Sequence, residues 1–469
     1  MEGVLFVNRV AELELLEKLH ASGKAEFFVL YGRRRVGKTE LLAHFCADKR
    51  AVFFVADLGS EASLRSALSN AANTVLFGPD QAGAVYSTWE DLFQALGRAA
   101  QTERLVVVLD EFPYLAGAHP PIASVLQRIW DRSLKSSLIM LILSGSTIGM
   151  MEDTVLGYQA PLYGRRTGGY LLEPFRFQEA RLFFESYPPE DQVRLYAVYG
   201  GTPAYLQTLR TELSPAENIR DGILTRGAFL YDEARFVLQQ ELREPRNYFA
   251  VLEAIAAGRT RLNEIKQATG IDGAAAYLDT LQQLHLVERR VPVTERQPHK
   301  SRRGIYRLRD PYLRFWFRHV HPNRSQLERS GAEIVLKTQV LPQLDLFTGP
   351  AFEDVCAQWL WSAGLSGRLP FTPIDVGGWW RANEEVDLVA LGETEALLVE
   401  CKWSAKPAGG DILEGLERKA GLVRPELGDR RILFALCARA GFTGSVRRAA
   451  EERSDLLLFD LPAILERWW

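Results

Sequence analysis

Short apolar runs alternate with amphipathic segments over the first third of the chain. The runs are "FFVLY" (27–31), "AVFFVA" (51–56), "RLVVVLD" (104–110), "LIMLILSG" (138–145) and "GYLLEPF" (169–175). Few charges interrupt the first four, a pattern typical of strands that are buried on both faces of a parallel sheet. Because helical periodicity fills the segments between them, this region predicts an α/β layer structure.

Helical patterns dominate the middle of the chain and give way to a second α/β region. Residues 176–240 predict helices throughout. Three short helical segments then cover residues 248–258, 261–270 and 272–287, and the β-rich stretch 287–310 follows them. This order resembles a winged helix-turn-helix. After a helical connector, residues from about 348 onward predict a further mixed α/β unit.

Composition and charge narrow the class of protein. The 469 residues exceed one ordinary core, and 47% hydrophobic with 25% charged residues is globular. With a net charge of −3, any affinity for nucleic acid must come from a local basic patch. The four cysteines, Cys46, Cys356, Cys401 and Cys437, lie far apart without a C-x-x-C pair. That spacing argues against a zinc site or a disulfide framework and is typical of a reducing compartment.

Neither a signal peptide nor a membrane span is predicted. The N-terminus lacks a basic start followed by an apolar block. The most apolar stretch, residues 138–143, is far too short to cross a bilayer. We therefore expect a soluble cytoplasmic protein with no membrane partner.

The segment "GRRRVGKT" matches the phosphate-binding pattern G-x-x-x-x-G-K-[ST] in full. Its residues are Gly32, Arg33, Arg34, Arg35, Val36, Gly37, Lys38 and Thr39. It follows a predicted strand and opens a predicted helix, so backbone N–H groups and the helix N-terminus can hold phosphates. Lys38 is then expected to reach the β- and γ-phosphates and the Thr39 hydroxyl to ligate Mg²⁺. ATP and Mg²⁺ are the predicted cofactors.

Polar residues at the ends of later strands extend the predicted ATP site. Asp110 and Glu111 end "LVVVLDEF" and suit a ligand of Mg²⁺ and a carboxylate that activates water. Ser144 could sense the γ-phosphate, or it could be an ordinary strand-end serine. Arg165 and Arg166 could stabilise transition-state charge in a neighbouring subunit, which would require a homo-oligomer, or they could belong to a basic loop.

Residues 1–310 resemble the prokaryotic, archaeal-type ATPase family of the AAA+ superfamily. The resemblance rests on "FVNRVAELELL", "YGRRRVGKTELL", "VVVLDEFPYL", "LILSGS", "PLYGRRTGGYLLEPF" and "GGTPAYL". It implies a five-stranded parallel sheet, a helical lid and a winged-helix domain. It also implies ATP hydrolysis with Asp110 and Glu111 as the Walker B pair, Ser144 as the sensor and one of the two arginines as a finger. Arg9 and Pro203 would lie near the nucleotide.

The stretch 286–309 is strongly basic. Eight basic residues face two acidic ones, Glu288 and Glu295. The basic residues are Arg289, Arg290, Arg296, Lys300, Arg302, Arg303, Arg307 and Arg309. Such an excess on a hairpin predicts contact with DNA phosphates. The alternative is a solvated wing that packs on the ATPase lid. The preceding helix is poor in Arg and Lys, which favours non-specific backbone contact over base readout.

The stretch "EEVDLVALGETEALLVECKW" (384–403) predicts a β-hairpin with a charged cluster. Side chains alternate along a strand, so Glu400 and Lys402 share one face while Cys401 points to the other. Asp387 lies on the partner strand, and an upstream helix could present Glu353. Three carboxylates can hold Mg²⁺, and a lysine can orient the attacking water. The alternative is a surface ion pair beside a solvated aspartate.

This order of residues resembles the PD-(D/E)xK nuclease fold and the nuclease-related C-terminal domain found in these ATPases. The resemblance implies Glu353, Asp387 and Glu400 as metal ligands, with Asp387, Glu400 and Lys402 in catalysis. Three domains are then predicted: an ATPase core with lid (1–240), a winged helix (241–310), and a connector with a nuclease-like domain (311–469). The leading hypothesis is an ATPase whose nucleotide state gates DNA cleavage. The alternatives are a nucleotide-dependent switch or scaffold, and a transcription regulator.

Overall fold

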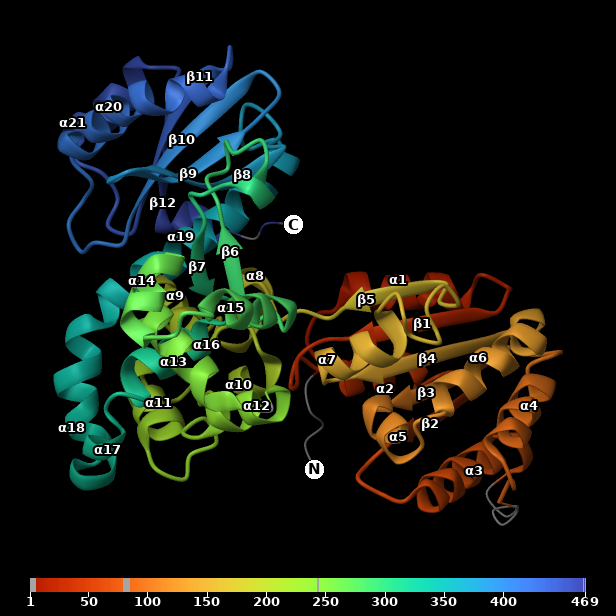
Figure 1. Ribbon diagram of the computed structural model, residues 1–469. Helices are drawn as coiled ribbons and strands as arrows, with labels where there is room; N and C mark the ends of the chain where they lie inside the picture. The colour runs from red at the N-terminus through yellow and green to blue at the C-terminus, as the bar shows by residue number, and fades with distance from the viewer. Residues whose placement is uncertain (1–5, 79–84, 243, 467, 469) are drawn as a thin grey trace. The chain divides into compact units, whose positions relative to one another are not determined.

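A computed structural model describes residues 6–78, 85–242, 244–466 and 468 (Figure 1). The chain divides into two compact units, Met1–Pro174 and Phe175–Trp469. Both boundaries predicted from the sequence, near residues 240 and 310, fall inside the second unit and stay predictions about its subdivision.

The first unit is built on a five-stranded parallel sheet, as predicted. Its strands are β1 (Glu26–Tyr31), β2 (Ala51–Val55), β3 (Leu105–Asp110), β4 (Ile139–Gly145) and β5 (Gly168–Leu171). Their spatial order is β2-β3-β4-β1-β5. β5 is shorter than the predicted run, because the chain leaves the sheet after Leu171. The order places β4 between the strand that precedes the phosphate loop and the strand that ends in Asp110.

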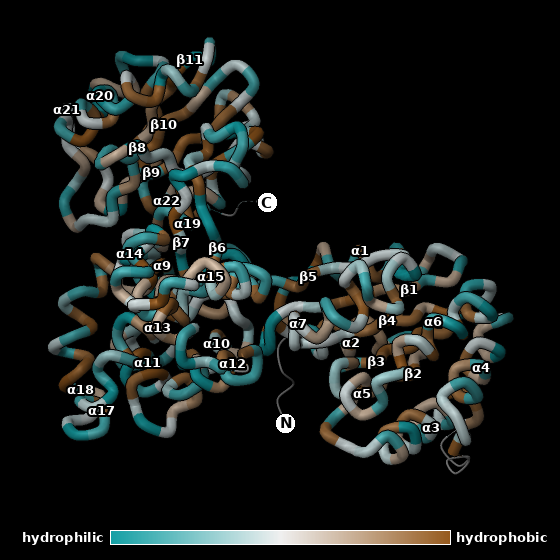
Figure 2. Tube along the Cα trace, viewed as in Figure 1, coloured by the Kyte–Doolittle hydropathy of each residue, from teal (hydrophilic) through white to brown (hydrophobic). Residues whose placement is uncertain are grey.

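Helices cover both faces of this sheet. They are α1 (Val10–His20), α2 (Lys38–Cys46), α3 (Glu61–Phe77), α4 (Trp89–Ala99), α5 (Phe112–Ala118), α6 (Ile122–Arg132) and α7 (Ile148–Met151). Alternate residues of the central strands form two separate cores, one shared with α1 and α2 and the other with α3 to α6. Burial on both faces explains why β3 and β4 are apolar along their whole length, as the hydropathy colouring in Figure 2 shows.

The second unit begins with helices. They are α8 (Phe177–Ala180), α9 (Pro189–Tyr199), α10 (Pro203–Leu206), α11 (Pro215–Ile219), α12 (Glu233–Glu241), α13 (Pro245–Ala256), α14 (Leu262–Thr269) and α15 (Ala274–Gln283). The antiparallel pair β6 (Val287–Arg290) and β7 (Ile305–Leu308) follows. Helices α13 to α15 and this hairpin have the order predicted for a winged helix-turn-helix.

A second five-stranded sheet lies near the C-terminal end. The connecting helices are α16 (Pro311–Phe315), α17 (Arg324–Ser330), α18 (Ala332–Val335) and the long α19 (Leu344–Leu365). The strands are β8 (Asp375–Arg381), β9 (Glu384–Leu391), β10 (Glu395–Lys402), β11 (Arg431–Ala438) and β12 (Leu456–Asp460). α20 (Gly410–Leu427) and α21 (Gly444–Glu452) connect the later strands, and α22 (Leu461–Leu465) follows the last.

This second sheet is mixed. Its order is β12-β11-β10-β9-β8, with β8, β9 and β10 antiparallel and β10, β11 and β12 parallel. The predicted hairpin is therefore β9 and β10, and the predicted helix that carries Glu353 is α19. A buried core that includes Leu398 and Leu416 joins one face of the sheet to α20. Among the described residues, no helix is both long enough and apolar enough to cross a membrane.

A buried histidine makes the second unit sensitive to acid. His319 is only 2% exposed, and its ring lies 5.0 Å from that of Phe315 and 5.3 Å from that of Phe347. Burial and the neighbouring charge of Arg318 lower the pKa of His319 to about 4. In the unfolded chain His319 binds a proton at about pH 6.5, whereas in the folded chain it binds one only near pH 4. The free energy of unfolding therefore falls as the pH falls from about 6.5 towards 4.

We expect His319→Phe to remove roughly 2 kcal/mol of the stability difference between pH 7 and pH 5. Urea unfolding at the two pH values, followed by circular dichroism, measures this difference, and a constant packing effect of the new ring cancels from it. His299→Gln, at an exposed position, is the control and should leave the pH dependence unchanged. An unchanged pH dependence in His319→Phe would show that His319 does not carry the effect.

Candidate nucleotide site and candidate metal centre

The phosphate loop connects β1 to α2. Gly37 has φ 92° and Gly32 has φ 152°, and a Cβ on Gly32 would lie 2.4 Å from the carbonyl oxygen of Leu172. Neither position accepts another residue without strain. These backbone angles let the loop turn sharply into the N-terminus of α2, where unpaired N–H groups and the helix dipole favour a phosphate.

Two cations hold this loop in shape. Lys38 Nζ donates hydrogen bonds to the carbonyl oxygens of Gly32 and Arg33, each at 3.0 Å. Arg9 is 5% exposed and donates to the carbonyl oxygens of Val36 at 2.8 Å and Glu173 at 3.0 Å. Arg9 thus ties the loop to the segment after β5. Its predicted contact with the nucleotide stays a prediction.

The Thr39 hydroxyl and the Asp110 carboxylate meet at the edge of the sheet. Thr39 Oγ1 donates to Asp110 Oδ2 at 2.5 Å, although the two residues lie 71 positions apart. Asp110 is fully buried, and its other oxygen accepts a hydrogen bond from the backbone N–H of Glu111 at 3.0 Å. A hydroxyl and a carboxylate at this distance are oxygen ligands of the kind that Mg²⁺ prefers, so the residues present fit the predicted ion.

Glu111 is positioned by a serine that the sequence analysis did not select. Ser146, just after β4, donates to Glu111 Oε2 from its hydroxyl at 2.7 Å and from its backbone N–H at 3.3 Å. Glu111 itself has φ 51°, an uncommon angle for a residue with a side chain. Ser146 is the second serine of the "SGS" at the end of β4, and the sequence pattern predicts a polar residue near the γ-phosphate at this place but points to Ser144, the first serine.

The predicted sensor, Ser144, lies between the two motifs as expected. It is fully buried in β4, and its Oγ has no hydrogen-bond partner among the described residues. A buried hydroxyl without a partner is costly, and a bound phosphate would supply one. Arg34 in the loop donates to the Tyr114 hydroxyl at 2.6 Å.

The remaining predicted nucleotide residues differ in their surroundings. Arg165 forms an ion pair with Asp131 at 3.2 Å. Arg166 is exposed. Pro203 is the first residue of α10 and belongs to the second unit. The roles assigned to these three residues stay predictions.

The structure brings Asp387, Glu400 and Lys402 into contact, and Glu353 of α19 lies near enough for its charge to act on that of Asp387. The register of β9 and β10 pairs Leu388 with Val399, which sets Asp387 opposite Glu400 on the same face. Lys402 Nζ donates to Glu400 Oε1 at 2.7 Å and lies 3.9 Å from Asp387 Oδ2. The backbone N–H of Cys401 donates to the same Asp387 oxygen at 2.7 Å. We call Glu353, Asp387, Glu400 and Lys402 the carboxylate site.

Positive charge compensates two of its carboxylates only in part: Lys402 lies near Asp387, and the charge of Arg307 acts on Glu353. Burial and the negative charge of Asp387 raise the pKa of Glu353 to about 7. Burial and the charge of Glu400 raise the pKa of Asp387 to about 6. Burial opposes the charge on Lys402, but its hydrogen bond to Glu400 and the negative charges of Asp387 and Glu400 together outweigh this effect and raise the pKa of the lysine. A divalent cation beside Glu353 and Asp387 would supply the charge that the protein does not.

A second lysine contacts this site. Lys419 of α20 donates to Glu400 Oε2 at 3.0 Å and to Oε1 at 3.3 Å. Glu400 is therefore paired with two ammonium groups, Lys402 and Lys419. No pattern in the sequence predicts Lys419 as a member of this site, because only the packing of α20 on the sheet places it beside β10.

Asp354, next to Glu353, collects arginines from three other elements. Arg307 of β7 donates to both of its oxygens, at 2.9 and 2.8 Å, while Arg290 of β6 and Arg314 of α16 donate at 3.1 and 3.2 Å. Burial would raise the pKa of Asp354, but these guanidinium groups outweigh it and hold the pKa well below its usual range. Two of the eight basic residues in 286–309, Arg290 and Arg307, therefore form ion pairs with α19.

Other basic residues of this hairpin are also bound within the chain. Arg303 pairs with Glu426 of α20 at 3.0 Å and with Glu295 at 3.2 Å. Arg289 donates to backbone carbonyls of the hairpin, and Arg309 contacts the ring of His285. Within the described part of the hairpin, three basic residues have side chains that form no hydrogen bond or ion pair. They are Arg296, Lys300 and Arg302, and all three are exposed. We call these three the tip cations.

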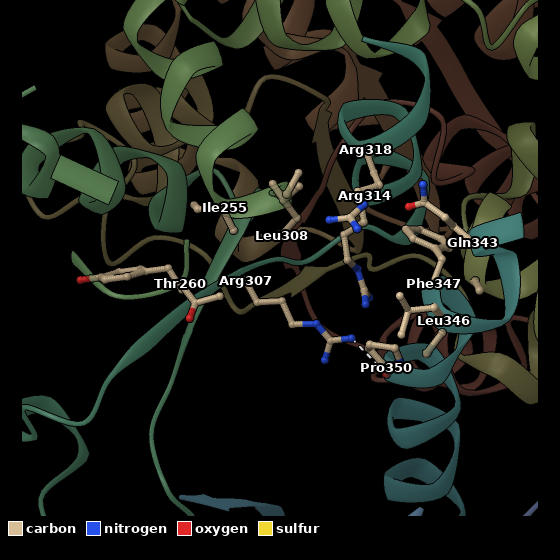
Figure 3. Close-up of a pocket in the computed structure, with 14 residues that line it drawn as sticks. Ile255, Thr260, Arg307, Leu308, Arg314, Arg318, Gln343, Leu346, Phe347 and Pro350 are labelled. Carbon is tan, nitrogen blue, oxygen red and sulfur yellow. Dashed lines mark hydrogen bonds between the residues drawn. The ribbon is translucent and has the colours of Figure 1, made fainter. Parts of the chain in front are cut away.

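A cavity of about 370 Å³ lies in the second unit (Figure 3). Apolar side chains, among them Ile255 and Phe347, form much of its wall, and Arg307, Arg314 and Arg318 also line it. In Figure 3 the Arg307 guanidinium reaches towards Pro350 of α19, whose carbonyl oxygen it bonds at 3.1 Å. Arg307 and Arg314 are both paired with Asp354, so the cavity belongs to the junction between the hairpin and α19.

Comparison with known proteins identifies an ATPase domain in the N-terminal part of the chain. A family of ATPase domains found predominantly in Archaea matches residues 6–209. A family described only as "Archaea bacterial proteins of unknown function" matches residues 316–412. Together with the phosphate loop and the Thr39–Asp110 pair, the first match defines an ATPase domain. The protein is therefore a nucleotide-binding ATPase.

An uncharacterized protein of Methanocaldococcus jannaschii is 32% identical over 465 residues, which cover 97% of this chain and 99% of that protein. The chain belongs to the same family as this protein. Similar solved structures include a Walker-type ATPase of Pyrococcus abyssi, with 21% identity, a TM-score of 0.48 and coverage of 67% of this chain and 96% of that one. Another is ORC2 of Aeropyrum pernix, with 15% identity, a TM-score of 0.44 and coverage of 72% and 96%.

The hydrogen bond from Ser146 to Glu111 predicts a graded loss of ATP hydrolysis. Glu111→Gln should lower kcat by roughly 10² to 10⁴, because the amide cannot accept the proton of the attacking water. Ser146→Ala should lower kcat by about tenfold, because the carboxylate remains but is no longer held. Both variants should bind ATP as the wild type does, which equilibrium binding measures beside phosphate release. Ser136→Ala, at an exposed position, is the control; equal activity in Ser146→Ala and Ser136→Ala would contradict the positioning role.

Proposed function

We propose that this ATPase acts on DNA and that its C-terminal sheet forms a Mg²⁺-dependent endonuclease gated by the nucleotide. The observation that carries the proposal is the convergence of Glu353, Asp387, Glu400 and Lys402 from α19, β9 and β10. The raised pKa values of Glu353 and Asp387 support a cation at this position. The αβββαβ order from α19 to β11 agrees with the fold that the sequence resembles.

In the ATP site, each residue has a role that its geometry supports. The loop from Gly32 to Gly37 would bind the phosphates through its N–H groups. Lys38 would exchange its two carbonyl partners for phosphate oxygens. Mg²⁺ held by Thr39 and Asp110 would neutralise charge on the phosphates. Glu111 would accept the water proton on Oε1, because Ser146 occupies Oε2.

In the carboxylate site, Glu353 and Asp387 would be the main metal ligands. Glu400 already has two ammonium partners, so its charge is largely balanced without an ion. Bound Mg²⁺ would polarise a phosphodiester and lower the pKa of a water molecule. Lys402 would orient that water from its position between Glu400 and Asp387, and Lys419 would keep Glu400 in place when Lys402 moves.

DNA would be held mainly through the tip of the basic hairpin. We propose that α13 to α15 with β6 and β7 form a winged helix-turn-helix. Since most of its other arginines are bound within the chain, the tip cations Arg296, Lys300 and Arg302 are the groups available for phosphates. A homo-oligomer is proposed on the exposed Arg166, which could reach the nucleotide of a neighbouring subunit.

The second candidate function is a nucleotide-dependent switch or scaffold, or a transcription regulator, that cuts no nucleic acid. Two observations favour it. Lys402 and Lys419 satisfy Glu400 in the absence of any metal. The hairpin arginines contact α19 and α20, as in a wing that serves as a structural joint. A cleavage assay separates the two candidates.

We expect the wild type to nick supercoiled plasmid in the presence of Mg²⁺ or Mn²⁺ and ATP. Asp387→Ala should lower the nicking rate by at least about 10²-fold, because a carboxylate proposed to bind the metal ion is lost. Lys38→Ala should lose ATP hydrolysis and the effect of ATP on cleavage. Gel separation of nicked and supercoiled plasmid measures the rate.

Asp375→Asn is the matched control, because Asp375 is an exposed carboxylate on β8 of the same sheet. It should cut as the wild type does. If the wild type never nicks DNA with either metal, with or without ATP, the nuclease is excluded and the switch is favoured. Equal cleavage by Asp387→Ala would exclude the carboxylate site as its source.

Replacement of the three tip cations by alanine should weaken DNA binding and its dependence on salt. Each lost phosphate contact lowers the slope of log K against log salt by about 0.9, so the triple variant should lose roughly 2 to 3 units of slope. Fluorescence anisotropy with duplex DNA at several salt concentrations measures it. Arg329→Ala, on exposed α17, should change the slope by less than about one unit. An unchanged slope in the triple variant would place DNA binding elsewhere or exclude it.

A further inference from the structure

Three of the four cysteines meet behind the carboxylate site, although their spacing in the sequence argued against a thiolate site. Cys401 and Cys437 are paired in the parallel register of β10 and β11, so their side chains leave the sheet on the same face. Cys356 is on α19, which packs against β10. Three separate elements therefore contribute one thiol each.

The geometry of these thiols is that of a metal-binding group. Their three sulfur atoms lie within 4.8 Å of one another. Zinc–sulfur bonds of about 2.3 Å separate two sulfurs on the same ion by roughly 4 Å. A small inward movement of the three sulfurs would therefore bring all of them to bonding distance of one ion. Cys356 and Cys437 are fully buried and Cys401 is 7% exposed, so bulk solvent would not compete for the ion.

An apolar core does not require three cysteines at one point. A buried thiol can act as a small apolar side chain, and that is the simplest role for each cysteine by itself. The neighbouring pairs on the same face of β10 and β11 are Val399 with Ala435 and Leu397 with Leu433, apolar side chains without any ligand atom. What distinguishes this point is that a helix and two strands supply soft ligands to a common centre.

We propose that Cys356, Cys401 and Cys437 form a binding site for a thiophilic d¹⁰ cation, Zn²⁺ or Cu⁺. Soft thiolates select these ions over Mg²⁺, so the site would not compete with the carboxylate site for its metal. Among the described residues no fourth His, Cys, Asp or Glu joins the group. Zn²⁺ would therefore need a water as its fourth ligand, while Cu⁺ accepts three sulfurs.

Binding has a defined balance of charge and protons. Each thiol that ligates the ion releases its proton to solvent, so three protons leave when all three cysteines bind as thiolates. Zn²⁺ then leaves one net negative charge in the site and Cu⁺ leaves two. The ion would join α19 to β10 and β11 and would stabilise the second unit, because the unfolded chain offers no such preformed group.

Anaerobic titration of the reduced full-length protein tests the site. Cd²⁺ is the spectroscopic probe, because its thiolate complexes absorb in the ultraviolet, and competition with Zn²⁺ and with Cu⁺ then ranks the two physiological ions. We expect one Cd²⁺ per chain, and Cys437→Ser should weaken its binding at least 10²-fold. Cys46→Ser is the matched control: Cys46 is also buried but lies alone on α2 of the first unit. It should bind as the wild type does.

Two further measurements keep the test decisive. Cys356→Ala should show the same loss of binding, and circular dichroism verifies that both cluster variants remain folded without metal. X-ray absorption at the Zn or Cu edge should find three sulfur neighbours. The proposal is overturned if no ion binds, if binding survives in Cys437→Ser and Cys356→Ala, or if the air-exposed protein holds a disulfide between cluster cysteines and never a metal. Absence of DNA cleavage would not affect any of these readouts.

Discussion

The arrangement of the second unit depends on the ion pairs that the Asp354 carboxylate forms with three arginines. The carboxylate bonds Arg290, Arg307 and Arg314, which come from β6, β7 and α16. Burial and the nearby charge of Arg314 lower the pKa of Arg307 to about 10, which shows how much positive charge is concentrated here. Removal of the Asp354 carboxylate would take an ion-pair partner from all three guanidinium groups, of which Arg290 would keep Glu288.

The position of α19 follows from this contact. Glu353 immediately precedes Asp354, and Cys356 lies two residues after it, so one anchored turn of α19 carries a member of the carboxylate site and a member of the cysteine cluster. Glu426 of α20 makes the equivalent contact on the other side, because it accepts hydrogen bonds from Arg303 and from the indole of Trp379. The basic hairpin is therefore held to α19 and to α20, and it also bonds β8, where the Trp380 indole donates to the carbonyl oxygen of Arg303 at 2.8 Å. Movement of the hairpin would be transmitted directly to Glu353.

The extent to which the sequence predicted each site depends on how local the signal is. The phosphate loop, the strand that ends in Asp110 and the β9–β10 hairpin are contiguous patterns, and strand alternation alone assigned Glu400 and Lys402 to one face. Lys419 is not predicted because tertiary packing, not sequence spacing, places it beside Glu400, whereas Ser146 belongs to the same "SGS" as Ser144 and lies within reach of the sequence pattern. The eight basic residues of 286–309 are evident in the sequence, yet their number cannot reveal that four of them pair with α19, α20 or the hairpin itself and that Arg309 contacts His285.

The cysteines show the same limit in its strongest form. Spacing rules detect metal sites whose ligands lie on one turn or one knuckle, and Cys356, Cys401 and Cys437 come from a helix and two strands. Only the parallel register of β10 and β11, together with the anchored turn of α19, brings them together. Cys401 also donates its backbone N–H to Asp387, so the two faces of β10 are linked through one peptide group. An ion that drew the Cys401 sulfur inward would move that N–H, and with it the Asp387 carboxylate on β9.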